Sequence, residues 1–356
     1  MIIINLRLDN CFNFSGVELN LSYPKKIAYS TIENEFLETR PNFRFKKAVV
    51  LMGSNATGKT CLGRAIKNTC DFLNTGNSAY ITDMVNDKQK PATVVLEFVN
   101  NDCILKEAVI TCDKGKVRIA LSTANIAEKD SYESAHAKLK NIYAGIYPED
   151  FVNLIGELDC RFAYPEIERS PVTEGIDKDI FLKTLKAVIG TLDPSLKEVK
   201  VSADLANGFI IRRGDSEIVI KDGRVLNKEL LSSGTVEGVD IAVFLASMQG
   251  KQNCLYYCDE HFSYIQTEIE KRIFQLMVGR LKNNEQLIFT THNADMLDLN
   301  LPKHSFALLR RNDEQQPEVV FVSSLLKRNT DSVRCAVEND SFCSLPDMSL
   351  LDELEA

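Results

Sequence analysis

The sequence predicts an α/β fold in which a mostly parallel sheet, covered by helices, is joined to an antiparallel β subdomain. Three observations lead to this prediction. A strand pattern, a glycine-rich loop and a helical pattern follow one another between residues 48 and 73. Strand-like runs separated by a turn occupy residues 93–122, and helices alternate with strands from residue 230 onward. Such alternation behind a glycine loop favours parallel strands with helices on their faces.

The first part of the chain predicts two strands and a helix. Residues 2–8 alternate as a strand, and "AVVLM" at residues 48–52 is a short apolar run that ends in glycine. After Lys59, five apolar residues and one threonine recur at helical spacing, at Leu62, Ala65, Ile66, Thr69, Phe72 and Leu73. The stretch "GSNATGKT" therefore lies between a strand and a helix, which is the context that a phosphate-binding loop needs.

This loop predicts nucleotide binding. Glycines allow backbone N–H groups to converge on phosphate oxygens, and the following helix adds its positive N-terminus. Lys59 would reach the terminal phosphates and Thr60 would offer a hydroxyl to Mg²⁺. The alternative is a chance glycine turn. The residues predicted to contact the nucleotide are Gly53, Ser54, Asn55, Ala56, Thr57, Gly58, Lys59, Thr60 and Cys61.

The middle of the chain predicts a compact insert at residues 91–227. The runs "TVVLEFV", "CILKEAVITC" and "VRIALS" indicate antiparallel strands, with "DKG" at residues 113–115 as a turn. A helix is expected at "DKDIFLKTLKAVIG", followed by strands at "EVKVSAD", "GFIIRRG" and "EIVIKDG". No heptad pattern is long enough for a coiled coil.

A second motif, "CLYYCDEHF", is an apolar strand that ends in Asp259 and Glu260. A carboxylate at the end of a buried strand can hold Mg²⁺, and the next one can take a proton from an attacking water. We assign the metal to Asp259 and the general-base role to Glu260. The alternative is that both acids mark the exposed end of a strand.

Two further motifs follow the same logic. "QLIFTTHNADML" is a strand that ends at His292, which can donate a hydrogen bond to a γ-phosphate, or can simply cap the next turn. "LSSGT" at residues 231–235 opens a long apolar helix. There Ser232, Ser233 and Gly234 can form an anion site, or can serve as a plain helix N-cap.

Together and in this order, "GSNATGKT", "LSSGT", "LYYCDE" and "TTHN" resemble the ATP-binding heads of ABC-type ATPases, within the RecF/SMC/OLD-like group. Asn55 and "IFTTHNADMLD" resemble the OLD-like abortive-infection ATPases of phage-defence loci, as does the closing stretch "SVRCAVENDSFCSLPD". The similarity covers residues 1–74 and 228–346.

The resemblance implies an ATPase with ATP and Mg²⁺ as cofactors and with Lys59, Glu260 and His292 in catalytic roles. It also implies a homodimer or higher homo-oligomer closed by ATP, in which Ser232 and Gly234 reach the γ-phosphate held by the Lys59 of a second copy. "LSSGT" departs from the glycine-rich signature of transporters. After the acidic pair, Ile265, Gln266 and Thr267 replace the Leu-His-Pro-like stretch of the family.

The motifs divide the chain into four predicted parts. Residues 1–90 and 228–336 form the two halves of the ATPase head, residues 91–227 the insert, and residues 337–356 an acidic tail. The tail from Asp347 to Ala356 carries leucines among acids, and we consider it a candidate docking segment for a partner protein.

Composition indicates which partners and which cellular compartment the protein is suited to. Lys and Arg number 42 against 50 for Asp and Glu, a net charge of −8, so nucleic-acid binding is not favoured without a local basic patch. Basic pairs such as Lys46 with Lys47 are expected on a solvated face. No apolar run approaches the roughly 18 residues of a membrane span, and the ten scattered cysteines indicate reduced thiols. We expect a cytoplasmic protein.

The leading functional hypothesis is an ATP-dependent dimer that regulates a separate effector protein in antiphage defence. The rival is a RecF/SMC-like DNA-binding repair or recombination ATPase. A third is a nuclease within the insert, although "ELDCRFAYPEIERS" offers acids without a metal-ligand pattern.

Overall fold

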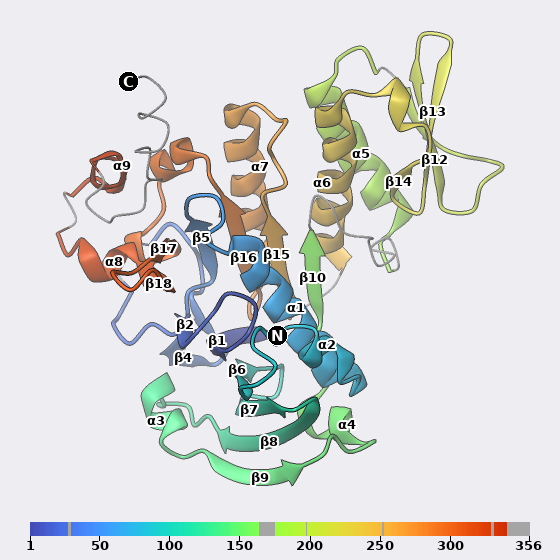
Figure 1. The fold of residues 1–356 in the computed structure, drawn as a ribbon. Helices are drawn as coiled ribbons and strands as arrows, with labels where there is room; N and C mark the ends of the chain where they lie inside the picture. The colour runs from blue at the N-terminus through green and yellow to red at the C-terminus, as the bar shows by residue number, and fades with distance from the viewer. Residues whose placement is uncertain (28–29, 164–174, 197, 251–252, 329–330, 340–356) are drawn as a thin grey trace, which may run out of the picture. The chain divides into compact units, whose positions relative to one another are not determined.

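The computed structural model describes residues 1–27, 30–163, 175–196, 198–250, 253–328 and 331–339. The chain packs into two compact units (Figure 1). The first contains Met1–Cys160, Asn253–Tyr256 and Asn283–Ala356, and the second contains Arg161–Gln252 and Tyr257–Lys282. The predicted insert is thus shared between the units, because its first strands pair with the N-terminal strand of the first unit.

The first unit contains a six-stranded antiparallel sheet in the order β2-β1-β6-β7-β8-β9. The three strands predicted within residues 93–122 are β6, β7 and β8. The turn between β7 and β8 is the predicted "DKG". There Lys114 and Gly115 have φ of 50° and 75°, as a tight hairpin requires. The strands are β1 (Ile2–Asp9), β2 (Val17–Asn20), β6 (Ala92–Val99), β7 (Ile104–Asp113), β8 (Lys116–Asn125) and β9 (Lys140–Gly145).

The second sheet has the order β10-β15-β16-β5-β17-β18. β5 pairs in parallel with β16 and β17, and β18 is antiparallel to β17. Every residue of β5 is buried, as expected for a strand between two neighbours with both faces covered. The strands are β5 (Ala48–Met52), β10 (Cys160–Ala163), β15 (Leu255–Asp259), β16 (Gln286–Thr291), β17 (Phe306–Arg311) and β18 (Pro317–Phe321).

Helix α1 (Lys59–Thr75) follows β5 and buries all six apolar-face residues that the spacing predicted. It ends at Thr75 and is followed by the C-cap residue Gly76, whose φ of 71° is typical of a helix C-terminus. The smaller elements of this unit are β3 (Phe36–Leu37), β4 (Arg40–Arg44), α2 (Ala79–Thr82), α3 (Tyr132–His136), α4 (Phe151–Ile155), η2 (Ala294–Asp298), η3 (Lys303–Ser305), α8 (Val322–Leu325) and α9 (Val333–Glu338).

The second unit combines helices with a four-stranded antiparallel sheet in the order β11-β12-β13-β14. The predicted helix is α5, capped by Asp177, whose side chain accepts from the N–H groups of Asp179 and Ile180. The elements are α5 (Lys178–Leu192), α6 (Ser233–Gly250), α7 (Thr267–Arg280), η1 (Lys228–Leu230), β11 (Glu198–Val201), β12 (Gly208–Arg213), β13 (Ser216–Lys221) and β14 (Arg224–Val225).

No long coiled coil occurs in the described ranges, where the longest helices, α6 and α1, have 18 and 17 residues. None of the helices in these ranges is long and apolar enough to cross a membrane. The described cysteines are free thiols. The candidate docking segment lies outside the described residues.

The expectation of a solvated face is wrong for Lys46 and Lys47, which are only 6% and 2% exposed. They directly precede the buried strand β5. Lys46 Nζ donates to the carbonyls of Asn20 and Ser22 at 2.7 Å, and it lies 4.0 Å from the ring centroid of Phe321. Burial lowers the pKa of Lys46 to about 7.

Candidate functional site

The glycine loop turns from β5 into α1 around the ammonium group of Lys59. Lys59 Nζ donates to the carbonyls of Gly53 at 2.6 Å and Ser54 at 3.2 Å. Thr57 Oγ1 donates to the Ser54 carbonyl at 2.8 Å. Ala56 and Gly58 have φ of 62° and 110°, so the backbone turns through left-handed conformations. The loop is therefore already folded around its lysine.

Both motif glycines occupy places where a side chain does not fit. A Cβ on Gly53 would lie 2.3 Å from the carbonyl oxygen of Leu309 on β17 and 2.9 Å from Thr57 Oγ1. A Cβ on Gly58 would lie 3.0 Å from the side chain of Asn13, at a φ that L-residues rarely adopt. Helix α1 begins directly after Gly58 without a side-chain cap. Its positive N-terminus is therefore suited to an anion.

His292 lies at the same edge of the sheet as this loop. In the parallel pairing of β16 with β5, Thr291 stands opposite Met52, so His292 and Gly53 are the first residues beyond the strands. The turn after β16 is capped by Asn293, whose Oδ1 accepts from the N–H of Asp295 at 3.0 Å. The capping role considered for His292 is thus performed by its neighbour, and His292 is exposed.

Asp259 and Glu260 belong to the second unit. Asp259 ends β15 and is 1% exposed, whereas Glu260 is half-buried. Burial, followed by the adjacent Asp259 carboxylate, raises the pKa of Cys258 well above its usual value, so this thiol stays neutral. Glu260 has a φ of 42°, a left-handed conformation that is uncommon for a residue other than glycine.

The "LSSGT" stretch lies at the start of α6, also in the second unit. Ser232 Oγ accepts from the N–H of Thr235 at 3.3 Å and lies 2.8 Å from Thr235 Oγ1. Ser232 therefore caps α6, as the alternative interpretation predicted. Ser232 and Ser233 are exposed at the same time, so they also offer a polar surface at a helix N-terminus.

The first turns of α6 contact the segment that follows Glu260. A Cβ on Gly234 would lie 2.7 Å from the carbonyl oxygen of Tyr264. Glu237 Oε2 accepts from the N–H of Tyr264 at 3.1 Å, and burial raises the pKa of Glu237. Sequence reasoning missed Glu237. The signal available was a pair of acids, Glu237 and Asp240, inside the mostly apolar stretch "GTVEGVDIAVFLASM".

The predicted site residues therefore form two groups. The first unit brings together the glycine loop and His292, and the second brings together "LSSGT" and the segment that begins with Asp259 and Glu260. Each group occupies the end of a strand or the start of a helix, where backbone groups and side chains can meet a ligand.

Comparison with known proteins identifies the fold. No family model and no curated protein matches the chain. An SMC head bound to the C-terminal winged-helix domain of ScpA aligns with a TM-score of 0.56 and 14% identity, over 92% of this chain and 100% of that one. A Pyrococcus furiosus SMC head with an extended coiled coil, bound to the C-terminal domain of ScpA, gives 0.53 and 13%, over 100% of both chains. The chain has the fold of an SMC head domain.

Proposed function

We propose that the chain is a Mg²⁺-dependent ATPase of the ABC type in which two copies close around ATP. The observation that carries this proposal is the loop folded around Lys59 Nζ, with His292 leaving the sheet beside it. Its glycines stand where a Cβ would collide with neighbouring atoms. Such a loop at a helix N-terminus suits the phosphates of a nucleotide.

The remaining polar residues suit the other parts of the reaction. The Thr60 hydroxyl and the Asp259 carboxylate are the oxygen ligands that Mg²⁺ prefers, and the ion would neutralise charge on the β- and γ-phosphates. Glu260 would accept a proton from the attacking water. Its left-handed backbone supports this assignment, because such strain concentrates at functional sites. His292 would donate to the γ-phosphate.

We propose further that each nucleotide site is shared between two protomers. Ser232 caps the 18-residue helix α6 and Ser233 and Gly234 begin it, and these three residues would bind the γ-phosphate held by a second copy. A two-fold dimer then contains two equivalent sites, each built from both chains.

A mixing experiment tests this arrangement. Lys59→Ala removes phosphate binding, and Ser233→Glu places a negative charge where the second copy's γ-phosphate would lie. A glutamate at a helix start is compatible with folding. Each variant alone should be inactive. An equal mixture should recover about a quarter of wild-type ATPase activity, because half of the dimers are mixed and one of their two sites is intact.

The matched control pairs Lys59→Ala with Glu260→Gln. Both changes affect the same half of a shared site, so no dimer in this mixture contains an intact site. Recovery in the first mixture only supports the shared site. Absence of recovery although both variants fold, or recovery in the control mixture, would exclude it.

The finer role that we propose is control of a separate effector protein by the ATP-bound dimer, in the cytoplasm and in antiviral defence. The defence role is supported only by the sequence resemblance of Asn55, "IFTTHNADMLD" and the closing stretch "SVRCAVENDSFCSLPD". The SMC heads with the same fold are described as bound to ScpA. Co-purification from the native locus with Glu260→Gln, with and without ATP, tests it: a partner retained only with ATP is expected.

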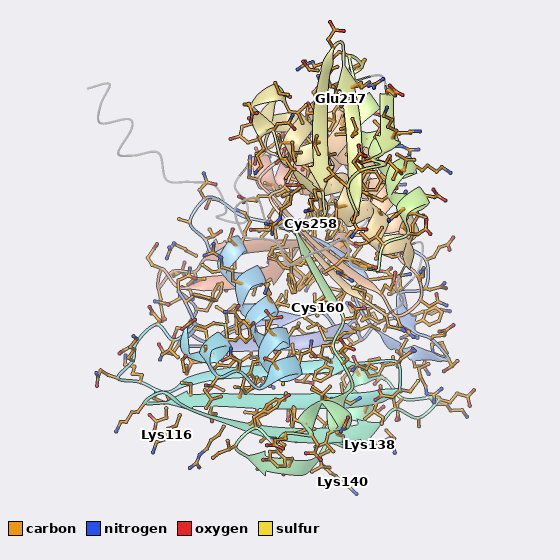
Figure 2. All side chains as sticks on the ribbon, turned by 90° about the vertical axis from the view of Figure 1, so that its right-hand side faces the viewer. Lys116, Lys138, Lys140, Cys160, Glu217 and Cys258 are labelled. Carbon is orange, nitrogen blue, oxygen red and sulfur yellow. The ribbon has the colours of Figure 1, made fainter. Side chains whose placement is uncertain are left out.

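DNA binding is the second candidate function, and one observation favours it. Exposed lysines occur at both ends of the antiparallel sheet: Lys116 at the start of β8 at one end, and Lys140 at the start of β9, with Lys138 just before it, at the other (Figure 2). Lys138 donates to Asp130 at 2.6 Å, which lowers the pKa of that carboxyl group. Binding to duplex DNA with ATP that weakens steeply with salt would support this candidate, and no binding at low salt would exclude it.

A further inference from the structure

A row of oxygen-bearing side chains crosses the antiparallel sheet of the first unit. Directly opposed residues on antiparallel strands point to the same face, so the row lies on one face of the sheet. The register from β2 to β9 gives its members as Asn20, Asn5, Glu97, Glu107, Ser122 and Asn141.

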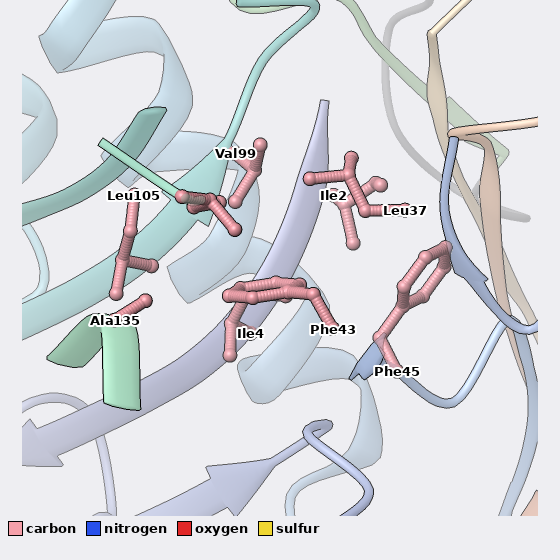
Figure 3. Packing of buried hydrophobic residues seen from close by; sticks show 9 residues of the cluster. Ile2, Ile4, Leu37, Phe43, Phe45, Val99, Leu105 and Ala135 are labelled. Atoms are coloured by element: carbon pink, nitrogen blue, oxygen red, sulfur yellow. The ribbon is translucent and has the colours of Figure 1, made fainter. Parts of the chain in front are cut away.

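The same face is covered by an apolar cluster just beyond this row. Val99 on β6 is two residues from Glu97, and Leu105 on β7 is two residues from Glu107. Both pack against Ile2, Phe43 and the α3 residue Ala135 (Figure 3). Residues of the row that border this cluster are removed from water. Glu97 is 0% exposed and Asn5 is 4% exposed.

Two carboxylates face each other in this setting. Glu97 and Glu107 are directly opposed across β6 and β7, an arrangement that is destabilising for like charges. Arg7 Nη2 lies 3.4 Å from Glu97 Oε1 and 3.9 Å from Glu107 Oε2. One guanidinium between two carboxylates leaves a net negative charge, which favours a further cation.

His136 adds a nitrogen to the two carboxylates. Its Nδ1 lies 3.1 Å from Glu97 Oε2. One oxygen of Glu97, one of Glu107 and a ring nitrogen of His136 all lie within 4.8 Å of one another. Ligands that share one ion at about 2.1 Å are up to about 4 Å apart, so small side-chain movements suffice to place an ion among them.

A buried amide oxygen supplies an independent sign of a missing ligand. Asn5 stands opposite Glu97 in the register. Its Nδ2 donates to Glu18 Oε1 at 2.7 Å, which fixes the orientation of the amide. Asn5 Oδ1 is buried and has no hydrogen-bond partner within the described part of the chain. A buried oxygen of this kind is expected to have a partner.

We propose that Glu97, Glu107 and His136 bind a divalent transition-metal ion, with Asn5 Oδ1 beside it. One imidazole and two carboxylates favour Mn²⁺ or Zn²⁺ over Mg²⁺ or Ca²⁺, which take oxygen ligands. The ion would join α3 to β6 and β7. It would be separate from the Mg²⁺ of the nucleotide site.

Two neighbouring residues have defined relations to this ion. Tyr132 OH donates to Glu97 Oε2 at 2.8 Å and would orient this ligand. The Arg7 side chain is 48% exposed and would turn toward solvent when the ion enters. Arg7 and the ion therefore compete for the same carboxylates.

Mn²⁺ binding to the full, nucleotide-free chain tests the proposal, measured by loss of the EPR signal of the free ion. Mn²⁺ is a better probe than Zn²⁺ because the chain has ten cysteines. His136→Asn and Glu107→Gln should each weaken binding about tenfold or more. Arg7→Met should strengthen it. Glu133→Gln, which changes an exposed carboxylate on α3, is the matched control and should leave binding unchanged.

The variants avoid the buried Glu97, and their thermal unfolding without metal establishes that each one folds. The proposal is overturned if the wild-type chain binds no Mn²⁺ at millimolar concentration. It is also overturned if His136→Asn or Glu107→Gln binds as tightly as the wild type, or if Arg7→Met fails to tighten binding.

Discussion

The strained backbone of Glu260 allows its catalytic and structural contributions to be separated. A left-handed conformation destabilises a residue with a Cβ by about 1–2 kcal/mol relative to glycine. Glycine loses more entropy on folding, by about 0.5–1 kcal/mol. Glu260→Gly should therefore increase the free energy of unfolding, by about 0.75 kcal/mol from the midpoints of these two ranges. Glu260→Gln keeps the Cβ and should leave stability almost unchanged.

Both substitutions remove the proposed general base. Because general-base catalysis contributes about 10²–10⁴-fold, kcat for ATP hydrolysis should fall by that factor in both variants. ATP binding should persist, since Lys59 and its loop are unchanged. Glu260→Gln should then accumulate an ATP-bound dimer, which light scattering would detect.

Urea unfolding without nucleotide and steady-state ATPase assays give the two quantities. Glu268→Gln, at an exposed acid in the first turn of α7, is the control and should change neither. A Glu260→Gly variant no more stable than Glu260→Gln would refute the strain argument. Wild-type hydrolysis by Glu260→Gln would refute the assignment of the base, and a monomer at saturating ATP and Mg²⁺ would refute the proposed dimer.

Three further predictions follow from the first unit. Gly53→Ala places a methyl group 2.3 Å from the Leu309 carbonyl oxygen, so it should lower the free energy of unfolding by about 1–3 kcal/mol. It should also weaken ATP binding in a fluorescent-nucleotide titration, and unchanged affinity would contradict the loop geometry. Lys46 has a pKa of about 7 in the folded chain and 10.5 in the unfolded chain. Between pH 7 and pH 10.5 the unfolded chain therefore binds one proton more than the folded chain, and the free energy of unfolding rises with pH. Lys46→Met should reduce this slope, measured by urea unfolding at several pH values, by up to about 1.4 kcal/mol per pH unit, and an unchanged slope would count against it. Asn293→Ala removes the cap of the turn after β16 and should lower the free energy of unfolding by about 1 kcal/mol. His292→Ala should lower the ATPase rate with little change in stability. The reverse result would assign the cap to His292 and the phosphate contact to Asn293.

Local patterns predicted the parts of the fold that local interactions determine. The spacing after Lys59 predicted the buried face of α1, and "DKG" predicted the hairpin between β7 and β8. In both places the periodicity or the turn chemistry lies within a short stretch of sequence. The four motifs were also found in this way, because each one is a strand end or a helix start.

Other features depend on pairing between distant segments, which one sequence does not reveal. The pairing of β6 with β1 moved the first half of the predicted insert into the first unit. Lys46 was expected in solvent because basic pairs usually lie on a solvated face. Its burial depends on the carbonyls of Asn20 and Ser22, which lie far back in the chain. The cross-strand register that sets Glu97 opposite Glu107 is likewise known only once the sheet is built.

The position of β5 has a consequence for synthesis of the protein. This fully buried strand ends at Met52, but its parallel neighbours β16 and β17 begin only at Gln286 and Phe306. During translation, the backbone N–H and C=O groups of "AVVLM" therefore cannot pair with these strands until most of the chain has left the ribosome. We expect the nascent chain to need protection from aggregation over this interval, and nucleotide binding to appear only after β17 has emerged.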